Sequence, residues 1–173
     1  MIGVPIPSTV VTIRDDSGNN LPIGQMGEIC VSGRQVMKGY WNTPDETANV
    51  VRADGWLFTC DVGYMREGGF VKCVDRKKDV IVVSGFKVYP NQVEEAAVTH
   101  PGVLEAEVKG VADARSDEAV NLFVVKRDPH LTEQELMAHL RLRLTAHKVP
   151  KIIEFRDQLP KNAIGKVLKY ELR

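Results

Sequence analysis

The pattern of apolar runs and turn residues changes near residue 79, and this change constrains the fold of the chain more than any other feature. Residues 1–78 contain short alternating runs, such as Gly27–Gly33, separated by clusters of turn residues. Such alternation predicts strands with one buried face, and the glycines at 68 and 69 predict a hairpin between two of them. Thr43 is predicted to cap a short helix that has Pro44 in its first turn. Residues 1–78 are therefore predicted to be β-rich.

From residue 79 onward, strand patterns and helix patterns alternate along the chain. Thr132 and Glu135 stand at the spacing of a capping box, which predicts the start of a helix. The expected strands are at 80–83, 103–111, 119–126 and 152–155, and the expected helices are at 90–100 and 131–144. The predicted fold class is α+β, with a β-rich part over residues 1–78 and a compact α+β domain over residues 79–173. A domain of this second size can fold by itself.

Composition excludes several classes of protein. The 173 residues are 43% hydrophobic and 27% charged, which is typical of a globular protein. A formal net charge of zero gives no reason to propose nucleic acid as a partner. The sequence shows no signal peptide and no apolar run of the roughly 20 residues that span a bilayer. Cys30, Cys60 and Cys73 form no metal-ligand pattern and are expected to be small buried side chains in a reducing cytoplasm.

A lysine that follows a glycine near the end of the chain is the first candidate for chemistry. Gly165 permits unusual backbone angles and close approach to a ligand, and Lys166 carries a mobile positive charge. This combination suits a carboxylate or phosphate ligand. Taken without its context, such a pair is more often part of a charged, solvated terminus.

Several segments in collinear order resemble the adenylate-forming superfamily, which comprises acyl-CoA synthetases, luciferases and the adenylation domains of peptide synthetases. The chain is most similar to the bacterial long-chain fatty-acid–CoA ligases within it. The segments that carry the resemblance are Gly39-Tyr-Trp, Val74-Asp-Arg-Lys-Lys-Asp, Val83-Ser-Gly-Phe, Val88-Tyr-Pro-Asn, Lys148-Val-Pro-Lys, Glu154-Phe-Arg-Asp and Pro160-Lys-Asn-Ala-Ile-Gly-Lys. Together they extend over essentially the whole chain.

The resemblance implies a reaction in two steps. A fatty acid is first adenylated by ATP with Mg²⁺, and the thiol of coenzyme A then displaces AMP. Members of the family also have a large N-terminal domain with a phosphate loop and a motif for adenine and magnesium, and neither motif occurs in these residues. We therefore expect the end of the AMP-binding N-terminal domain over 1–78 and the mobile lid domain over 79–173. The missing N-terminal domain is the expected partner, without which the chain is expected to be inactive.

Two residues are implied to contact the nucleotide from the first part. Asp61 would accept hydrogen bonds from the ribose hydroxyls, although an aspartate here is also a common turn residue. The family usually has glycine just before this aspartate, so Cys60 is expected to strain the loop if a positive φ is required. Arg76 would donate to the ribose or a phosphate. The alternative for Arg76 is a surface ion pair with Asp75 or Asp79.

The resemblance assigns roles to five further residues. Lys78 occupies the hinge between the two domains, and it can at the same time be a solvated connector lysine. Ser84 and Gly85 would lie on a strand that lines the coenzyme A tunnel, or would form a simple strand end or turn. Lys87 would face the nucleotide site. Lys166 is the candidate catalytic residue, because it would bridge the substrate carboxylate and the α-phosphate. No metal ligand is assigned to the chain.

Three functions stay open from the sequence. The first is a long-chain fatty-acid–CoA ligase, the second is a non-catalytic module that binds a nucleotide or a protein, and the third is an acyl-CoA synthetase for another carboxylic acid. The acyl pocket would lie outside these residues, so chain-length preference rests on the resemblance alone. A cytoplasmic location is expected, and a long-chain substrate is compatible with peripheral contact at the inner membrane, although no segment forms an amphipathic anchor.

Overall fold

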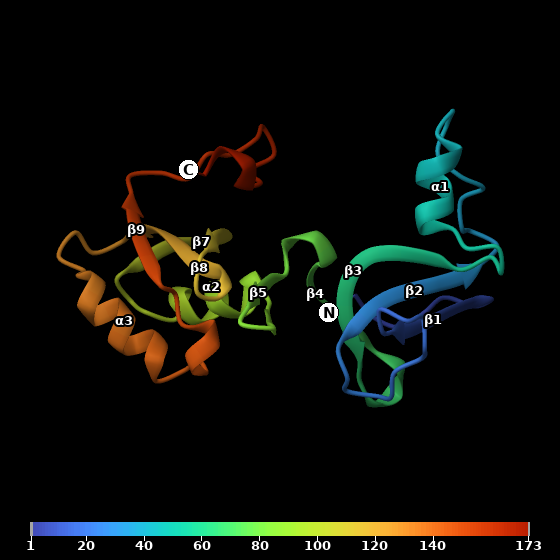
Figure 1. Cartoon of the computed structure of the whole chain (residues 1–173), viewed down its shortest axis with the longest axis horizontal. Helices are drawn as coiled ribbons and strands as arrows, with labels where there is room; N and C mark the ends of the chain where they lie inside the picture. The colour runs from blue at the N-terminus through green and yellow to red at the C-terminus, as the bar shows by residue number, and fades with distance from the viewer. Residues whose placement is uncertain (1, 173) are drawn as a thin grey trace. The chain divides into compact units, whose positions relative to one another are not determined.

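The computed structural model describes residues 2–172. The chain divides between Lys78 and Asp79 into two compact units (Figure 1). We call residues 1–78 the first unit and residues 79–173 the second unit, and each is described by itself.

The first unit, which was predicted to be β-rich, is built on an antiparallel sheet of four strands in the order β1-β2-β3-β4 (Figure 1). A hairpin through the short 3₁₀ turn η1 joins β3 and β4, because Gly68 and Gly69 supply the positive φ angles that the turn requires. Its small core is formed by Ile13, Ile29 and Val71. The strands are β1 (Thr9–Arg14), β2 (Gly27–Gly33), β3 (Leu57–Met65) and β4 (Val71–Arg76), and η1 is Glu67–Gly69.

A short helix, α1 (Pro44–Val50), lies between β2 and β3. Its start at Pro44 confirms the predicted helix, and Thr43 occupies the predicted N-cap position. The Thr43 side chain makes no capping hydrogen bond, and its hydroxyl lies 3.5 Å from the Trp41 carbonyl oxygen. Thr47 supplies the local order instead, since its hydroxyl accepts from the Tyr40 N–H and donates to the Thr43 carbonyl oxygen.

The second unit is a five-stranded sheet that centres on β8. The order β6-β5-β8-β7 is antiparallel throughout, and β9 pairs with β8 in parallel. Every residue from Ala119 to Val125 is buried, which is typical of a strand covered on both faces. The elements are β5 (Ile81–Val83), β6 (Phe86–Val88), α2 (Pro90–Val98), β7 (Val103–Asp113), β8 (Asp117–Lys126), α3 (Glu133–Arg141) and β9 (Ile152–Arg156). Three 3₁₀ turns complete the description: η2 (Lys77–Asp79), η3 (Ala146–Lys148) and η4 (Lys169–Glu171).

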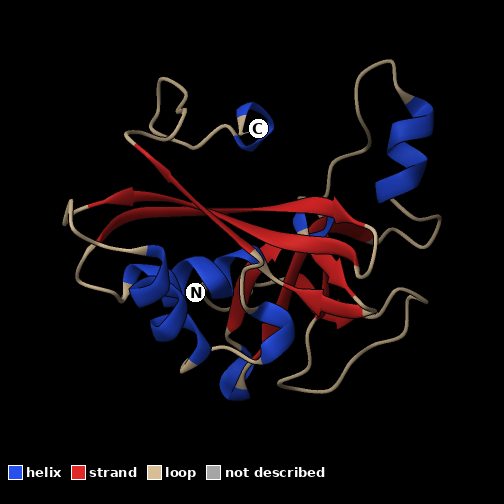
Figure 2. Ribbon diagram, turned by 60° about the vertical axis from the view of Figure 1, so that its left-hand side comes forward, coloured by secondary structure: helices blue, strands red, loops and turns tan. Residues whose placement is uncertain are grey.

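The two faces of this sheet are covered differently (Figure 2). Helices α2 and α3 cover one face, where Val120, Leu122 and Val124 of β8 join the main core. The segment after β9, residues 157–172, covers the other face through a smaller cluster formed by Phe123, Val125, Leu159 and Leu172. We call this segment the tail. The period of two along β8 thus sends alternate side chains to the helices and to the tail.

The predicted capping box at the start of α3 is confirmed. The Thr132 hydroxyl accepts from the Glu135 N–H at 3.3 Å, and the Glu135 carboxylate accepts from the Thr132 N–H at 3.1 Å. These two bonds satisfy amide groups that the helix itself leaves unpaired. The helix ends at Arg141, earlier than the sequence predicted, although Leu144 still packs against the core.

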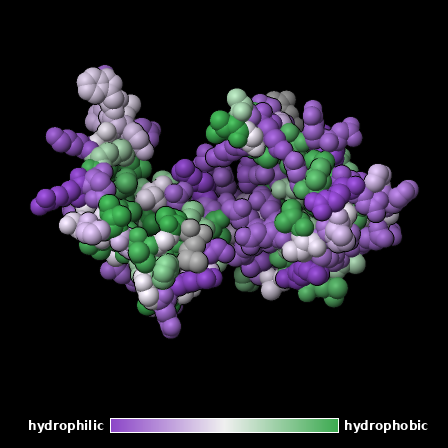
Figure 3. Space-filling model, turned by 180° about the vertical axis from the view of Figure 1, so that it is seen from behind, coloured by the Kyte–Doolittle hydropathy of each residue, from purple (hydrophilic) through white to green (hydrophobic). Residues whose placement is uncertain are grey.

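Several large apolar side chains are exposed on the first unit. They include Ile2, Ile6, Val10 and Ile23. Figure 3 shows apolar surface gathered on one face of this unit. Among residues 2–172, no helix has the length and apolar character needed to cross a membrane.

Replacement of Leu140 by alanine is expected to destabilise the second unit, because the Leu140 side chain is 0% exposed in the core under α3. A loss of about 2–5 kcal/mol in the free energy of unfolding is expected from the cavity that the change leaves. Leu142→Ala is the matched control, since Leu142 is 84% exposed. Urea unfolding followed by circular dichroism measures both variants, and equal losses would contradict the packing described here.

Candidate functional site

Asp61 and Arg76 lie opposite each other in the register of β3 and β4. The Arg76 Nε lies 3.0 Å from the Asp61 Oδ1, and the two side chains are 57% and 33% exposed. The ion-pair partner of Arg76 is therefore Asp61. The alternative expected from the sequence was an ion pair with Asp75 or Asp79. A largely solvated pair of this kind contributes little to stability.

Cys60 occupies a backbone conformation that favours glycine. Its φ is +60°, and it lies where the pairing of β2 with β3 shifts register. The strain expected for a positive φ at Cys60 is therefore present, and it costs about 1–2 kcal/mol for a residue with a Cβ. The expectation that Cys60 is buried is wrong, because the bulge turns this side chain to the surface.

The other two cysteines agree better with the expectation that the cysteine side chains are buried. Cys30 is buried and Cys73 is partly buried. Burial raises the pKa of the Cys30 thiol to about 11, with a smaller contribution from the Glu28 carboxylate. A thiol with this pKa stays protonated at neutral pH and is a poor nucleophile.

Glu28 fixes the strained residue from the neighbouring strand. Its side chain is 6% exposed, and its Oε1 accepts from the Cys60 N–H at 2.9 Å. Its Oε2 binds the Lys77 Nζ at 2.8 Å, and Lys77 also pairs with Asp16 at 3.1 Å. The hydrogen bond to Glu28 raises the pKa of Lys77. Sequence reasoning did not identify Glu28, because it is one of several polar residues in an alternating strand pattern.

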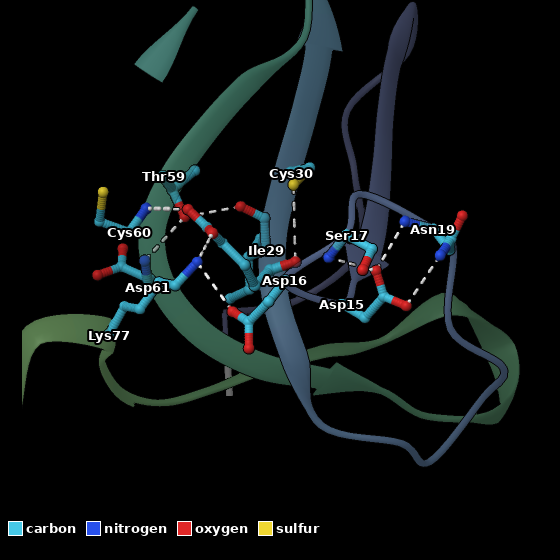
Figure 4. A network of polar contacts seen from close by, with 11 residues as sticks. Asp15, Asp16, Ser17, Asn19, Ile29, Cys30, Thr59, Cys60, Asp61 and Lys77 are labelled. Atoms are coloured by element: carbon cyan, nitrogen blue, oxygen red, sulfur yellow. Dashed lines mark hydrogen bonds and ion pairs between the residues drawn. The ribbon is translucent and has the colours of Figure 1, made fainter. Parts of the chain in front are cut away.

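The backbone of Asp61 is held by a second contact in the same bulge (Figure 4). The Thr59 hydroxyl donates to the Ile29 carbonyl oxygen at 2.8 Å and accepts from the Asp61 N–H at 3.1 Å. Glu28 and Thr59 together fix the two consecutive amides of Cys60 and Asp61. The Asp61 carboxylate therefore projects from a rigid bulge and not from a flexible turn.

Ser84 and Gly85 form the tip of the β5–β6 hairpin. Their φ angles are +49° and +81°, which is the pattern of a two-residue type I′ turn. The prediction that they lie on a strand is wrong, and the alternative of a turn is confirmed. A Cβ added to Gly85 would meet no atom within 4 Å, so the tip is open. Lys87 follows on β6, opposite Val82, and its side chain is exposed.

Lys166 lies on a turn whose backbone is rigidly held. The Asn162 Oδ1 accepts from the N–H groups of Ile164 and Lys166 at 3.1 and 2.9 Å. The Asn162 N–H donates to the Lys166 carbonyl oxygen at 2.9 Å, and Gly165 has the positive φ of +81° that closes the turn. The Lys166 side chain is exposed. Asn162 was not singled out from the sequence, although asparagine is the residue whose side chain most readily forms such a turn.

A charged cluster after this turn was also missed from the sequence. The Lys169 Nζ lies 2.9 Å from Glu107 on β7 and 3.4 Å from Glu94 on α2. The two carboxylate side chains are 12% and 15% exposed. Burial raises the pKa of Glu94 to about 7, Lys169 opposes this rise, and Glu107 adds to it. The three charges are far apart in the sequence, so no local pattern connects them.

The predicted site residues divide between the two units. Asp61, Arg76 and Lys78 belong to the first unit, and Lys78 is exposed in the 3₁₀ turn where that unit ends. The residues Ser84, Gly85, Lys87 and Lys166 belong to the second unit. Within residues 2–172, no group of three or more His, Cys, Asp or Glu side chains is arranged to hold a metal ion.

Two protein families match parts of this chain. Residues 1–41 match the family described as AMP-binding enzyme, and residues 92–166 match the AMP-binding enzyme C-terminal domain. This chain belongs to the AMP-binding enzyme family. The matched ranges include Lys166 and lie in both units.

Relatives with known names extend over nearly the whole chain. A long-chain-fatty-acid–CoA ligase of Yersinia pestis is 56% identical over 99% of this chain and 30% of its own length. A feruloyl-CoA synthase of Amycolatopsis sp is 45% identical over 99% of the chain and 35% of its own length. The ATP-bound crystal structure of MatB from Rhodopseudomonas palustris matches 99% of the chain and 34% of its own, with 37% identity and a TM-score of 0.93. The chain thus spans about a third of the length of the proteins that it matches.

Replacement of Cys60 tests the strain in the bulge. Cys60→Gly is expected to raise the free energy of unfolding of the first unit by up to about 1 kcal/mol, because glycine relieves the positive φ but gains entropy in the unfolded chain. Cys60→Val is expected to lower it by about 1–2 kcal/mol, since a β-branched residue tolerates this conformation poorly. Both tryptophans, Trp41 and Trp56, are in the first unit, so tryptophan fluorescence in urea reports its unfolding. Equal stability of the two variants would contradict a strained bulge.

Glu94 is expected to give the second unit a specific dependence on pH. The unfolded chain releases this proton near pH 4.5 and the folded unit near pH 7, so the folded state binds more protons between these values. The contribution of Glu94 to stability therefore falls as pH rises from about 4.5 to about 7. Glu94→Gln removes this slope, so the stability of the variant relative to the parent should increase over that range and then level off. Urea unfolding at several pH values measures it, and a constant difference would contradict the shift.

Proposed function

We propose that this chain is the C-terminal part of an AMP-forming long-chain fatty-acid–CoA ligase that uses ATP, Mg²⁺ and coenzyme A. The observation that carries the proposal is the Lys166 turn, which presents an exposed ammonium group from a backbone fixed by the Asn162 side chain. Electrostatic catalysis requires a charge that is already in position when the transition state forms. The family to which the chain belongs and the named ligase of Yersinia pestis support the same reaction class.

The proposed reaction begins when a carboxylate oxygen of the fatty acid attacks the α-phosphorus of ATP. The bond from that phosphorus to the bridging oxygen breaks, and pyrophosphate leaves with the electron pair. Lys166 is proposed to stabilise the negative charge that gathers on the α-phosphate and on the entering carboxylate. In the second step the thiolate of coenzyme A attacks the acyl carbonyl carbon, and AMP leaves. A single fixed cation acting on the first step is typically worth a factor of 100 or more in rate.

Asp61 and Arg76 are proposed to hold the ribose of the nucleotide. The Asp61 carboxylate has two acceptor oxygens, and the ion pair with Arg76 engages Oδ1. Ribose hydroxyls are donors that match a carboxylate, and the guanidinium has further N–H groups for the ribose or a phosphate. The rigid bulge that carries Asp61 makes this contact preorganised. Mg²⁺ would supply charge neutralisation on the phosphates, and no residue of this chain is assigned to it.

The remaining site residues are proposed to serve the second step. Lys78 lies in the short connection where the two units divide, so rotation there would move one unit as a rigid body about the other. Ser84 and Gly85 are proposed to border the path of the coenzyme A arm, because an open glycine tip admits a thiol arm close to the backbone. Lys87 is proposed to face the nucleotide. The upstream region present in the longer relatives is the proposed partner, and the cytoplasm, with peripheral contact at the membrane, is the proposed location.

A synthetase for an aromatic acid is the second candidate. The feruloyl-CoA synthase of Amycolatopsis sp matches as much of this chain as the fatty-acid ligase does, at a lower identity. The residues described here would perform the same chemistry on either acid, since both present a carboxylate. Competition between palmitate and ferulate for the full-length enzyme separates the two candidates. A preference for ferulate would overturn the long-chain assignment and leave the adenylation mechanism intact.

Lys166→Ala in the full-length enzyme is expected to separate the two steps. Formation of acyl-adenylate from ATP and palmitate should fall by roughly 100- to 1,000-fold, because the charge that stabilises the first transition state is lost. Formation of the thioester from supplied acyl-adenylate and coenzyme A should be largely unchanged. Lys151→Ala is the matched control, since it removes another exposed lysine of the second unit. An unimpaired rate of pyrophosphate release in Lys166→Ala would contradict the role of Lys166.

A further inference from the structure

The Lys166 turn is bracketed by two lysines that both contact the edge strand β7. The Lys161 Nζ lies 2.7 Å from the Glu105 Oε1. After the turn, the Lys169 Nζ lies 2.9 Å from the Glu107 Oε1. Glu105 and Glu107 are two residues apart on β7, so their side chains project from the same face of the strand. The tail is thus attached to one row of β7 on both sides of Lys166.

The charged side chains of this row of β7, Glu105, Glu107 and Lys109, are paired by groups of the tail. The Glu107 side chain is 12% exposed and the Glu105 side chain 34% exposed. The cost of an unpaired charge therefore falls mainly on Glu107. The tail supplies Lys161 and Lys169 for the two carboxylates and the Leu172 carbonyl oxygen for Lys109, at 2.6 Å. The register of these contacts sets where the tail sits along β7.

The base of the turn is closed by backbone bonds between the two bracketing lysines. The Leu168 N–H donates to the Pro160 carbonyl oxygen at 2.8 Å, and Lys161 and Val167 form an antiparallel bridge. These bonds join the two ends of the turn, so the Lys166 backbone is held between the attachments at Lys161 and Lys169. Glu94 strengthens the second attachment, because it faces Lys169 from α2 and also accepts from the Val108 N–H at 2.9 Å.

We propose that Lys161 and Lys169, paired with Glu105 and Glu107, are positioning residues that fix the reach and direction of Lys166 toward the reacting groups. The proposal rests on the adenylation role proposed for Lys166. Lys161 and Lys169 contact no substrate, and they act only through the placement of the turn. Misplacement of a catalytic group by about 1 Å can cost two orders of magnitude in rate. The effect is therefore confined to the half-reaction that uses Lys166.

The test is a set of variants of the full-length enzyme. Lys169→Met and Lys161→Met each remove one attachment, Lys169→Arg restores the charge, and Lys151→Met is a matched control that breaks an ion pair with Asp113 at the other end of β7. Each single variant is also made in the Lys166→Ala background. The rates of adenylate formation and of thioester formation from supplied acyl-adenylate are measured for all of them, together with the free energy of unfolding. Amide hydrogen exchange over 161–168 reports the order of the turn.

The expected result is a drop of roughly 10-fold or more in adenylate formation for Lys169→Met, and a smaller drop for Lys161→Met, which breaks a more exposed pair. Thioester formation should be unchanged, Lys169→Arg should recover most of the rate, and amide exchange over the turn should accelerate. In the Lys166→Ala background the two methionine variants should have no further effect, because the group that they position is gone.

Two results overturn the positioning role and leave the proposed function standing. One is an equal loss of both half-reactions in Lys169→Met and Lys161→Met. The other is a loss of adenylate formation by the same factor with and without Lys166. Either result would mean that the two lysines merely stabilise the fold. Full adenylate formation in Lys166→Ala alone is a different failure, since it would overturn the proposed function and the positioning role that rests on it.

Discussion

Burial of β8 on both faces is the constraint on which the rest of the second unit depends. Val120, Leu122 and Val124 meet the helices, whereas Phe123 and Val125 meet the tail. An apolar strand that is covered on one face alone would leave Phe123 and Val125 in water, at a cost of about 25 cal/mol for each Å² of apolar surface. The tail must therefore lie across the sheet, and the charged row of β7 beside it determines where. The position of Lys166 is thus a consequence of how a buried strand is covered.

The first unit depends instead on a strained bulge in one of its strands. Its bulge in β3 forces Cys60 into a positive φ, and the nearly buried carboxylate of Glu28 stabilises the result by binding the Cys60 amide and Lys77. Strained backbone of this kind persists only where surrounding contacts hold it, and it is often found at functional sites. Here the strain directs Asp61 across the sheet toward Arg76. The two units therefore present their candidate groups from rigid backbone: a bulge in the first and an asparagine-capped turn in the second.

Local patterns in the sequence predicted most of the fold, because alternation, turn glycines and the Thr132 capping box are local signals. The prediction was wrong for Ser84 and Gly85, which form the hairpin tip and not the strand. Two side-chain partners were also not foreseen: the Thr43 hydroxyl lies near the Trp41 carbonyl oxygen and makes no capping bond, and Arg76 pairs across the sheet with Asp61. Glu28, Glu94 and Glu107 were missed because their partners lie far away in the sequence. The roles of the site residues came from resemblance, since spacing alone does not connect Asp61 with Lys166.

Transfer of labelled oxygen tests whether the carboxylate is activated by attack on the α-phosphate. The full-length enzyme is incubated with ATP, Mg²⁺, coenzyme A and palmitate that carries ¹⁸O in its carboxylate, and the products are analysed by mass spectrometry. Adenylation followed by thiol attack at the carbonyl carbon leaves one carboxylate oxygen on the nucleotide, so AMP with a single ¹⁸O is expected. Appearance of the label in inorganic phosphate together with ADP, or AMP without label, would contradict it.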